Sequence, residues 1–311
     1  MFCDPDIACA YVLFLPFVFK NEGEMLALGV VGGRVMLVDE ATGEVKWEVQ
    51  AHPGGEILQT QVAMSKDGRF VASVGGNDEH WKLWDVASGA LYRAGARHDG
   101  WESATTGCIC EMPGSGATRF KGACPVGAHT SFLLAVAFSP CGQRLATGGK
   151  DCAVITWDAH TGKAEHHLKG HSAMVWTVAF SADGARLASG SHEGPIHVWN
   201  VSTGVLLRTM QQDNEYDGFG VHFSPTDHNR LAAVGHDIVV WDVDSGENRD
   251  KYDDTMVGGS LIGVIFAVFS PDGRTIATAE TGAREVQHQP STGHPDSLVL
   301  HPNPGVLSRP V

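Results

Sequence analysis

The chain has 311 residues, and 43% of them are hydrophobic, which is enough to build a packed core and argues against global disorder. Its 36 acidic and 22 basic residues give a net charge of -14, which argues against a general nucleic-acid binder because such proteins neutralise phosphates with Lys and Arg. The 38 glycines and 14 prolines favour frequent turns over long helices, and the seven scattered cysteines do not form the disulfide framework of a small secreted domain. We therefore expect reduced thiols in a cytoplasmic protein, with the nucleus as the alternative location.

An apolar run, IACAYVLFLPFVFK, extends from Ile7 to Lys20 near the start of the chain. The preceding MFCDPD carries two aspartates and no basic residue, which is the wrong flank for a signal peptide. The run is also shorter than the roughly 20 residues that a membrane-spanning helix needs. We interpret it as a buried strand, and we expect no association with a membrane.

One pattern recurs along the chain in register. Its copies cover Val18–Asp39 (a looser match), Ala51–Asp85, Ala128–Asp158, Gly170–Asn200 and Asn214–Asp242, and a partial copy covers Ile265–Glu280. Two aromatic columns align them: Phe138, Phe180, Phe223 and Phe269 in one, and Trp84, Trp157, Trp199 and Trp241 in the other. Anchors of uninterrupted copies lie about 42 to 46 residues apart, which is the spacing of four-stranded propeller blades.

Each copy reads as short strands separated by turns. In the copy at Gly170–Asn200, the runs TVAFS, RLASGS and PIHVWN are rich in Val, Ile and aromatic residues, and ADGA and SHEG between them carry turn residues. A polar turn such as AHTGK or VSTGV follows each Trp, and a weaker fourth strand comes before the next copy. No segment holds a helical period long enough to compete with this interpretation.

At these residues the chain resembles the WD40 repeat family. The resemblance rests on Gly170-His171 at the start of one copy and on the pairs Trp84-Asp85, Trp157-Asp158, Trp199-Asn200 and Trp241-Asp242. It implies an all-β fold, a WD40-type β-propeller of four-stranded antiparallel blades, over residues 7–282. We count five full blades and a partial sixth where the family most often has seven, so we expect an incomplete ring. We place an insertion at residues 93–126, between two blades, and expect a disordered tail at residues 283–311.

The resemblance also implies a buried hydrogen-bond relay in each blade. Its members in one copy are His129, Thr147, Asp151 and Trp157, and in the next copy they are His171, Ser189, Glu193 and Trp199, with the glutamate in place of the aspartate. The same residue types could form a catalytic triad. Because the surroundings of a nucleophile would not be copied from blade to blade, we interpret these groups as structural.

The insertion holds the one other concentration of chemically versatile side chains. Cys108, Cys110, Cys124 and the nearby His98 could supply four zinc ligands, but the C-x-C spacing is not that of a zinc finger, and a surface loop is the alternative that we favour. The chain contains neither H-E-x-x-H nor G-x-S-x-G. We therefore expect no metal, no cofactor and no enzymatic activity.

By resemblance, the chain is expected to be a non-catalytic scaffold that assembles a multiprotein complex through its propeller faces. The predicted contact residues lie on the narrow face, ahead of the first strand of three blades: Phe132, Leu134, Met174, Trp176, Asp217 and Phe219. In another interpretation, some of these side chains turn inward and pack. An enzyme with its site at the central channel and a nucleic-acid-binding propeller remain as alternative functions. The sequence identifies neither the partner proteins nor the oligomeric state.

Overall fold

The computed structural model describes residues 18–19, 25–30, 32–53, 60–75, 79–95, 129–192, 194–211, 220–234, 238–252, 264–280, 299–300 and 306–310. These residues form strands and turns, without a helix. The chain divides into two compact units, Met1–Lys169 and Gly170–Val311, which are described separately below.

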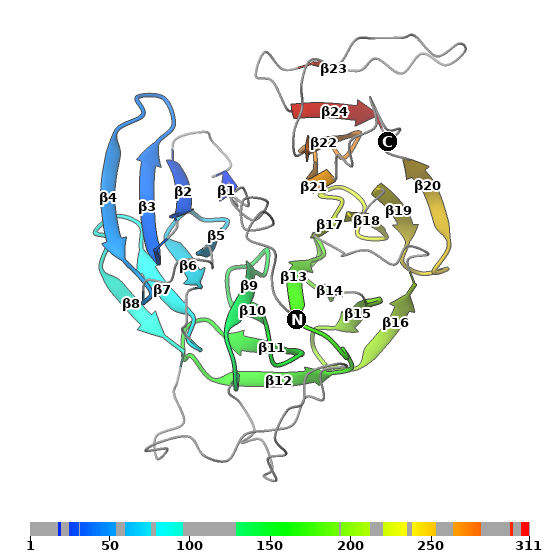
Figure 1. Cartoon of the computed structure of the whole chain (residues 1–311), viewed down its shortest axis with the longest axis horizontal. Helices are drawn as coiled ribbons and strands as arrows, with labels where there is room; N and C mark the ends of the chain where they lie inside the picture. The colour runs from blue at the N-terminus through cyan, green and yellow to red at the C-terminus, as the bar shows by residue number, and fades with distance from the viewer. Residues whose placement is uncertain are drawn as a thin grey trace, which may run out of the picture. The chain divides into compact units, whose positions relative to one another are not determined.

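The first unit contains three antiparallel sheets of four strands each. The first sheet has β1 (Val18–Phe19), β2 (Met25–Val30), β3 (Arg34–Asp39) and β4 (Val45–Gln50). The second has β5 (Gln61–Met64), β6 (Phe70–Val74), β7 (Lys82–Asp85) and β8 (Leu91–Ala94). The third has β9 (Leu133–Phe138), β10 (Arg144–Gly149), β11 (Ala153–Asp158) and β12 (Ala164–Lys169). In each sheet the strands lie in chain order, from blue to green in Figure 1.

The second unit also contains three sheets of four strands. The first has β13 (Val175–Phe180), β14 (Arg186–Ser191), β15 (Ile196–Asn200) and β16 (Leu206–Met210). The second has β17 (Gly220–Phe223), β18 (Arg230–Val234), β19 (Ile238–Asp242) and β20 (Asn248–Tyr252). The third has β21 (Val264–Phe269), β22 (Thr275–Glu280), β23 (Val299–Leu300) and β24 (Val306–Pro310). Only in this last sheet does the order depart from the chain, since β24 lies between β22 and β23.

Two tight turns shape each repeat, and the third sheet illustrates both. Between β9 and β10, Gly142 has a φ of 71°, and its N–H donates to the carbonyl of Ser139 at 2.8 Å. Between β11 and β12, Gly162 has a φ of 72°, and Asp158 Oδ1 accepts from the N–H of Thr161 at 2.6 Å. A positive φ is readily adopted only by glycine, so the recurring Gly in these turns is a conformational requirement.

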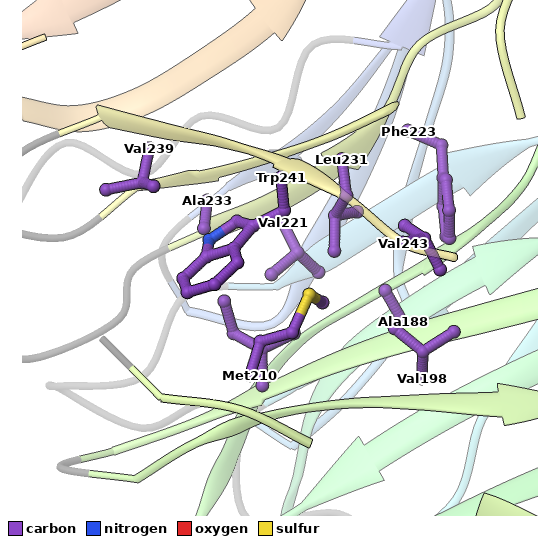
Figure 2. Packing of buried hydrophobic residues seen from close by; sticks show 11 residues of the cluster. Ala188, Val198, Met210, Val221, Phe223, Leu231, Ala233, Val239, Trp241 and Val243 are labelled. Carbon is purple, nitrogen blue, oxygen red and sulfur yellow. The ribbon is translucent and has the colours of Figure 1, made fainter. Parts of the chain in front are cut away.

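Neighbouring sheets within a unit pack face to face through apolar side chains. In the first unit, Leu37 and Trp84 belong to a cluster that joins the first and second sheets, and Leu83 and Trp157 to one that joins the second and third. In the second unit, Figure 2 shows Val198 and Met210 of the first sheet facing the side chains of β17–β19. Burial of this kind stabilises by roughly 25 cal/mol for each Å² of apolar surface removed from water.

The all-β class and the four-stranded antiparallel blades are confirmed. The chain fills the third and fourth positions of the sixth sheet with β24 and β23, which lie in the segment expected to be a disordered tail. β8 extends to Ala94, so the first two residues assigned to the insertion belong to a strand, and residues 96–128 lie outside the described residues. Of the apolar run at the start of the chain, only β1 is described. The incomplete ring stays a prediction.

Candidate functional site

The structure brings His129, Thr147, Asp151 and Trp157 together in the third sheet. Asp151 lies within 2.9 Å of His129 Nδ1, and the other imidazole nitrogen, Nε2, lies 2.8 Å from Thr147 Oγ1. The indole N–H of Trp157 donates to the same hydroxyl oxygen at 2.8 Å. A carboxylate can only accept, so Nδ1 carries the proton, Nε2 accepts from the threonine hydroxyl, and that hydroxyl accepts from the indole. Every polar group in this chain of hydrogen bonds has a partner.

The carboxylate at the end of this relay is held in its ionised form. Burial opposes ionisation of Asp151, but the hydrogen bonds from His129 and from the N–H groups of Thr130 and Ala153 outweigh it, and the pKa of Asp151 lies below its ordinary 3.8. The backbone N–H of Thr130 donates to Oδ2 at 2.8 Å. Asp151 therefore also fixes the chain that leads into β9.

The equivalent relay in the first sheet of the second unit is shorter. His171 Nε2 lies 2.6 Å from Ser189 Oγ, and Trp199 Nε1 donates to the same oxygen at 2.8 Å. His171 Nδ1 is buried and has no hydrogen-bond partner within the described part of the chain, and Glu193 lies outside it. Burial, with a smaller contribution from His197, whose tilted ring lies 4.3 Å away between centroids, lowers the pKa of His171 to about 3.

A third relay was not predicted. In the second sheet of the first unit, His52 Nε2 lies 2.9 Å from Ser73 Oγ, and Trp84 Nε1 donates to this oxygen at 2.8 Å. The pair Ala51-His52 occupies the same place in its copy as Ala128-His129. Alignment of the repeats could therefore have identified His52 as a relay residue. In the second sheet of the second unit, by contrast, Ala233 stands in the hydroxyl position.

The relays leave these polar groups unsuited to chemistry on a substrate. Thr147, Ser189 and Ser73 are each 0% exposed, and each hydroxyl already accepts from an indole and contacts an imidazole. A nucleophile must reach its substrate, and these oxygens have no access to solvent. What the arrangement can do is hold the second and third strands of a sheet to the segment ahead of the first strand through buried hydrogen bonds.

The predicted contact residues of the third sheet divide into one partly exposed and one buried side chain. Phe132 is partly exposed just ahead of β9, and its carbonyl accepts from the N–H of Lys150 at 2.8 Å. The Lys150 ammonium lies over its ring, 5.7 Å from the centroid. Leu134, within β9, is only 8% exposed and turns inward, as the alternative interpretation expected for some of these positions.

The next repeat presents an aromatic pair in the same place. Met174 and Trp176 are partly exposed around the start of β13, and the carbonyl of Met174 accepts from the N–H of His192 at 2.8 Å. The rings of Trp176 and His192 lie 6.3 Å apart. Asp217 and Phe219, the contact residues predicted in the third blade of this series, lie outside the described residues.

Within the described ranges, no group of three or more His, Cys, Asp or Glu side chains is placed to hold a metal ion. The Cys108, Cys110, Cys124 and His98 considered as zinc ligands fall in residues that the structure does not describe. The same described part has no helix that is long and apolar enough to cross a bilayer.

Comparison with known proteins agrees with the repeats seen in the fold. The family described as "WD domain, G-beta repeat" matches residues 43–85, 123–158 and 162–200. These three segments are WD40 repeats. The chain is also similar to Protein HIR1 of Yarrowia lipolytica, with 32% identity over 102 residues. The matched segment is 33% of this chain and spans 9% of that protein.

Proposed function

We propose that this WD40-repeat protein is a non-catalytic scaffold that binds other proteins through its narrow face, with Phe132, Met174 and Trp176 as contact residues. The observation that carries the proposal is Trp176, a large aromatic side chain that stays partly exposed at the start of β13. Tryptophan is the residue type most enriched among those that dominate protein–protein binding energy.

The surroundings of these side chains favour binding because they are held in place. Phe132 and Met174 are each fixed by a hydrogen bond from the turn between the second and third strands of their sheets, through Lys150 and His192. The relay side chain Asp151 holds the backbone of Thr130, two residues ahead of Phe132. A contact surface that is already ordered loses less conformational entropy when a partner binds.

Two further observations favour proteins over the alternative partners. The relays do not offer a catalytic site, because their hydroxyl groups are fully buried. The net charge of -14 disfavours nucleic acid, for which binding rests on a surplus of Lys and Arg. We also propose that the protein assembles a multiprotein complex in the cytoplasm.

Affinity capture with matched variants tests the proposal. Trp176→Ala is compared with the unaltered protein and with Tyr92→Ala, which removes an aromatic side chain that is 47% exposed on β8. We expect Trp176→Ala to lose the specifically captured proteins and to keep its melting temperature, while Tyr92→Ala keeps the captured proteins. If Trp176→Ala unfolds the protein and any soluble fraction binds normally, Trp176 belongs to the core and the proposed surface is wrong.

A further inference from the structure

The outer strands of three sheets carry a hydrogen-bond donor at the same place in the strand register. Trp47 of β4, Arg93 of β8 and Arg208 of β16 each pair with the residue that stands two positions before the end of the third strand of their own sheet. An indole and a guanidinium differ in shape and charge, but both donate hydrogen bonds. The three positions are therefore equivalent in the fold although the residue types are not the same.

In the first unit, each donor reaches the turn between the third and fourth strands of the next sheet. Trp47 Nε1 donates to the carbonyl of Val86 at 2.8 Å. Arg93 Nη1 donates to the carbonyl of Thr161 at 3.3 Å. Both acceptors are main-chain oxygens, so each contact ties a side chain of one sheet to the backbone of the next.

The same two side chains also pack on the glycine of the turn that they reach. Gly89 and Gly162 have φ angles of 68° and 72° in these turns. A Cβ atom at Gly89 would lie only 2.8 Å from Cγ of Trp47. A Cβ atom at Gly162 would lie 3.1 Å from Cδ of Arg93. Close packing and a hydrogen bond thus occur together at two successive boundaries between sheets.

In the second unit, two arginines of the first sheet hold turns of the second sheet. Arg208 donates to the carbonyl of Asp244, which lies in the turn between β19 and β20. Arg186 donates to Oδ1 of Asp244 at 2.7 Å. Its other terminal nitrogen donates to Oδ1 of Asn229 at 3.2 Å. The contact from the outer strand is therefore supported here by a second cation.

Contacts between neighbouring repeats decide whether the repeats open one by one or together. When each repeat contacts only its neighbours, stability is approximately a sum of terms for the repeats and terms for the boundaries between them. Apolar clusters already join the faces of neighbouring sheets, as Leu37 and Trp84 do in the first unit. The donors of the outer strands add a polar contact at each boundary, and this contact is lost as soon as either of the two sheets opens.

We propose that Trp47, Arg93 and Arg208 are straps that couple the opening of neighbouring sheets, where a strap is an outer-strand side chain that donates to a turn of the next sheet. In the first unit, two straps join three sheets in series, so these sheets open together. The straps act at the end of the sheets opposite the turns of Lys150 and His192. The inference therefore does not rest on the narrow-face proposal.

Native-state hydrogen exchange at increasing urea concentration, followed by mass spectrometry, tests the proposal with the full chain. In the unaltered protein, we expect the strand amides of the first unit to converge on one opening reaction. Arg93→Met removes the donors and keeps an apolar stem, so the amides of β9–β12 should then exchange about three- to tenfold faster than those of β2–β4. Arg144→Met is the matched control. It removes the same charge but breaks an ion pair inside the third sheet, with Glu165 at 2.6 Å, and should leave the common opening intact.

A pair of glycine substitutions tests the strap at Trp47 by a second route. Gly43 and Gly89 occupy the same turn in successive sheets, with φ angles of 70° and 68°, so alanine strains the backbone equally at both. A Cβ atom at Gly43 would meet no described atom within 4 Å, whereas one at Gly89 would collide with the ring of Trp47. We expect Gly89→Ala to lower the urea midpoint more than Gly43→Ala does, and this difference to disappear in a Trp47→Ala background.

Three results would overturn the proposal. If the sheets of the first unit open separately in the unaltered protein, they are not coupled. If they still open together in Arg93→Met, or if Arg144→Met separates them equally, the strap is not what couples them. If Gly89→Ala and Gly43→Ala lower the urea midpoint equally, Trp47 does not lie on the turn of the next sheet in solution.

Discussion

Asp151 and His129, 22 positions apart in the sequence, meet at 2.9 Å between Oδ2 and Nδ1. The contact joins the turn after β10 to the segment that leads into β9, and through Thr147 it extends to Trp157 on β11. A single carboxylate thus orients groups from three parts of one sheet. Because the relay is buried, the loss of any member leaves another polar group without a partner.

We predict that Asp151→Ala lowers the free energy of unfolding by about 1–3 kcal/mol, since His129 Nδ1 and the N–H of Thr130 lose their acceptor. Urea unfolding followed by tryptophan fluorescence measures the change. Glu193→Ala is expected to cost less, because the relay of that repeat already departs from the pattern. Equal shifts of the two midpoints would contradict the alignment of the repeats.

The buried His171 predicts a stability that falls on acidification. Its pKa is about 3 in the folded protein against an ordinary 6.5, so below pH 6.5 the unfolded chain takes up a proton that the folded chain does not. The free energy of unfolding therefore decreases between about pH 6.5 and 3. We expect His171→Asn to reduce the pH dependence of the free energy of unfolding by an amount that corresponds to at most one bound proton. Urea titrations between pH 7 and 5 measure this dependence. An unchanged slope would show that His171 is accessible to protons in the folded state.

Ala233 predicts a gain in stability from restoring a missing hydroxyl. Trp241 Nε1 is buried and has no hydrogen-bond partner in the described part of the chain, while its equivalents donate to Ser73, Thr147 and Ser189. We expect Ala233→Ser to raise the free energy of unfolding by about 0.5–1.5 kcal/mol.

The neighbouring residue provides the control for this change. Ala232 is also fully buried but belongs to the apolar cluster on the other face of β18. Ala232→Ser buries a hydroxyl among apolar side chains and should destabilise the protein. If thermal unfolding shows that both substitutions destabilise it, the space beside Trp241 does not accommodate a hydrogen bond.

Cys141 stands where three other repeats have an aspartate, namely Asp67, Asp183 and Asp272. Ser139 Oγ lies 3.4 Å from its sulfur, whereas Ser65 and Ser181 donate to Asp67 and Asp183 at 2.6 Å. Partial burial opposes the thiolate, but hydrogen bonds from Ser139 and the N–H of Gln143 hold the pKa of Cys141 below its ordinary value. The hydrogen-bond donors of this turn therefore favour an anionic side chain at position 141.

We expect Cys141→Asp to stabilise the protein by about 0.5–1.5 kcal/mol at pH 7, and Cys141→Ser to bring no comparable gain. The pKa values of Asp67 and Asp183 are lowered in their turns, so the gain should be present above about pH 4 and disappear as the pH falls further. Thermal melts at pH 7 and pH 3 measure both effects. If the gain in stability persists at pH 3, it does not come from the carboxylate.

The repeats and their relays could be predicted because they are local patterns. A Trp every 42 or so residues, with a His and a hydroxyl at fixed offsets, specifies which side chains meet within one sheet. Counting back from Phe138 failed for Leu134 for a physical reason. That residue lies inside β9, which packs against β5 and β6, so only Phe132 ahead of the strand remains partly exposed.

The sixth sheet could not be predicted from such patterns. β24 pairs with β22 across a long connection, and neither β23 nor β24 carries the Trp-Asp pair that marks the third strand elsewhere. The straps also escaped prediction, because their donors and acceptors lie 39, 68 and 36 positions apart and so share no fixed spacing. Only the register of the outer strands shows that Trp47, Arg93 and Arg208 are equivalent.

Hydrogen exchange of the tryptophan indoles, followed by NMR of the ¹⁵N-labelled protein in D₂O, tests most directly whether the repeated polar groups are structural relays. The indole N–H groups of Trp84, Trp157 and Trp199 donate to buried hydroxyls, so they should exchange far more slowly than the indole N–H of free tryptophan. Asp151→Ala should accelerate exchange at Trp157 far more than at Trp84. If the indole of Trp157 in the unaltered protein exchanges as fast as that of free tryptophan, the relay is not formed in solution and the account is wrong.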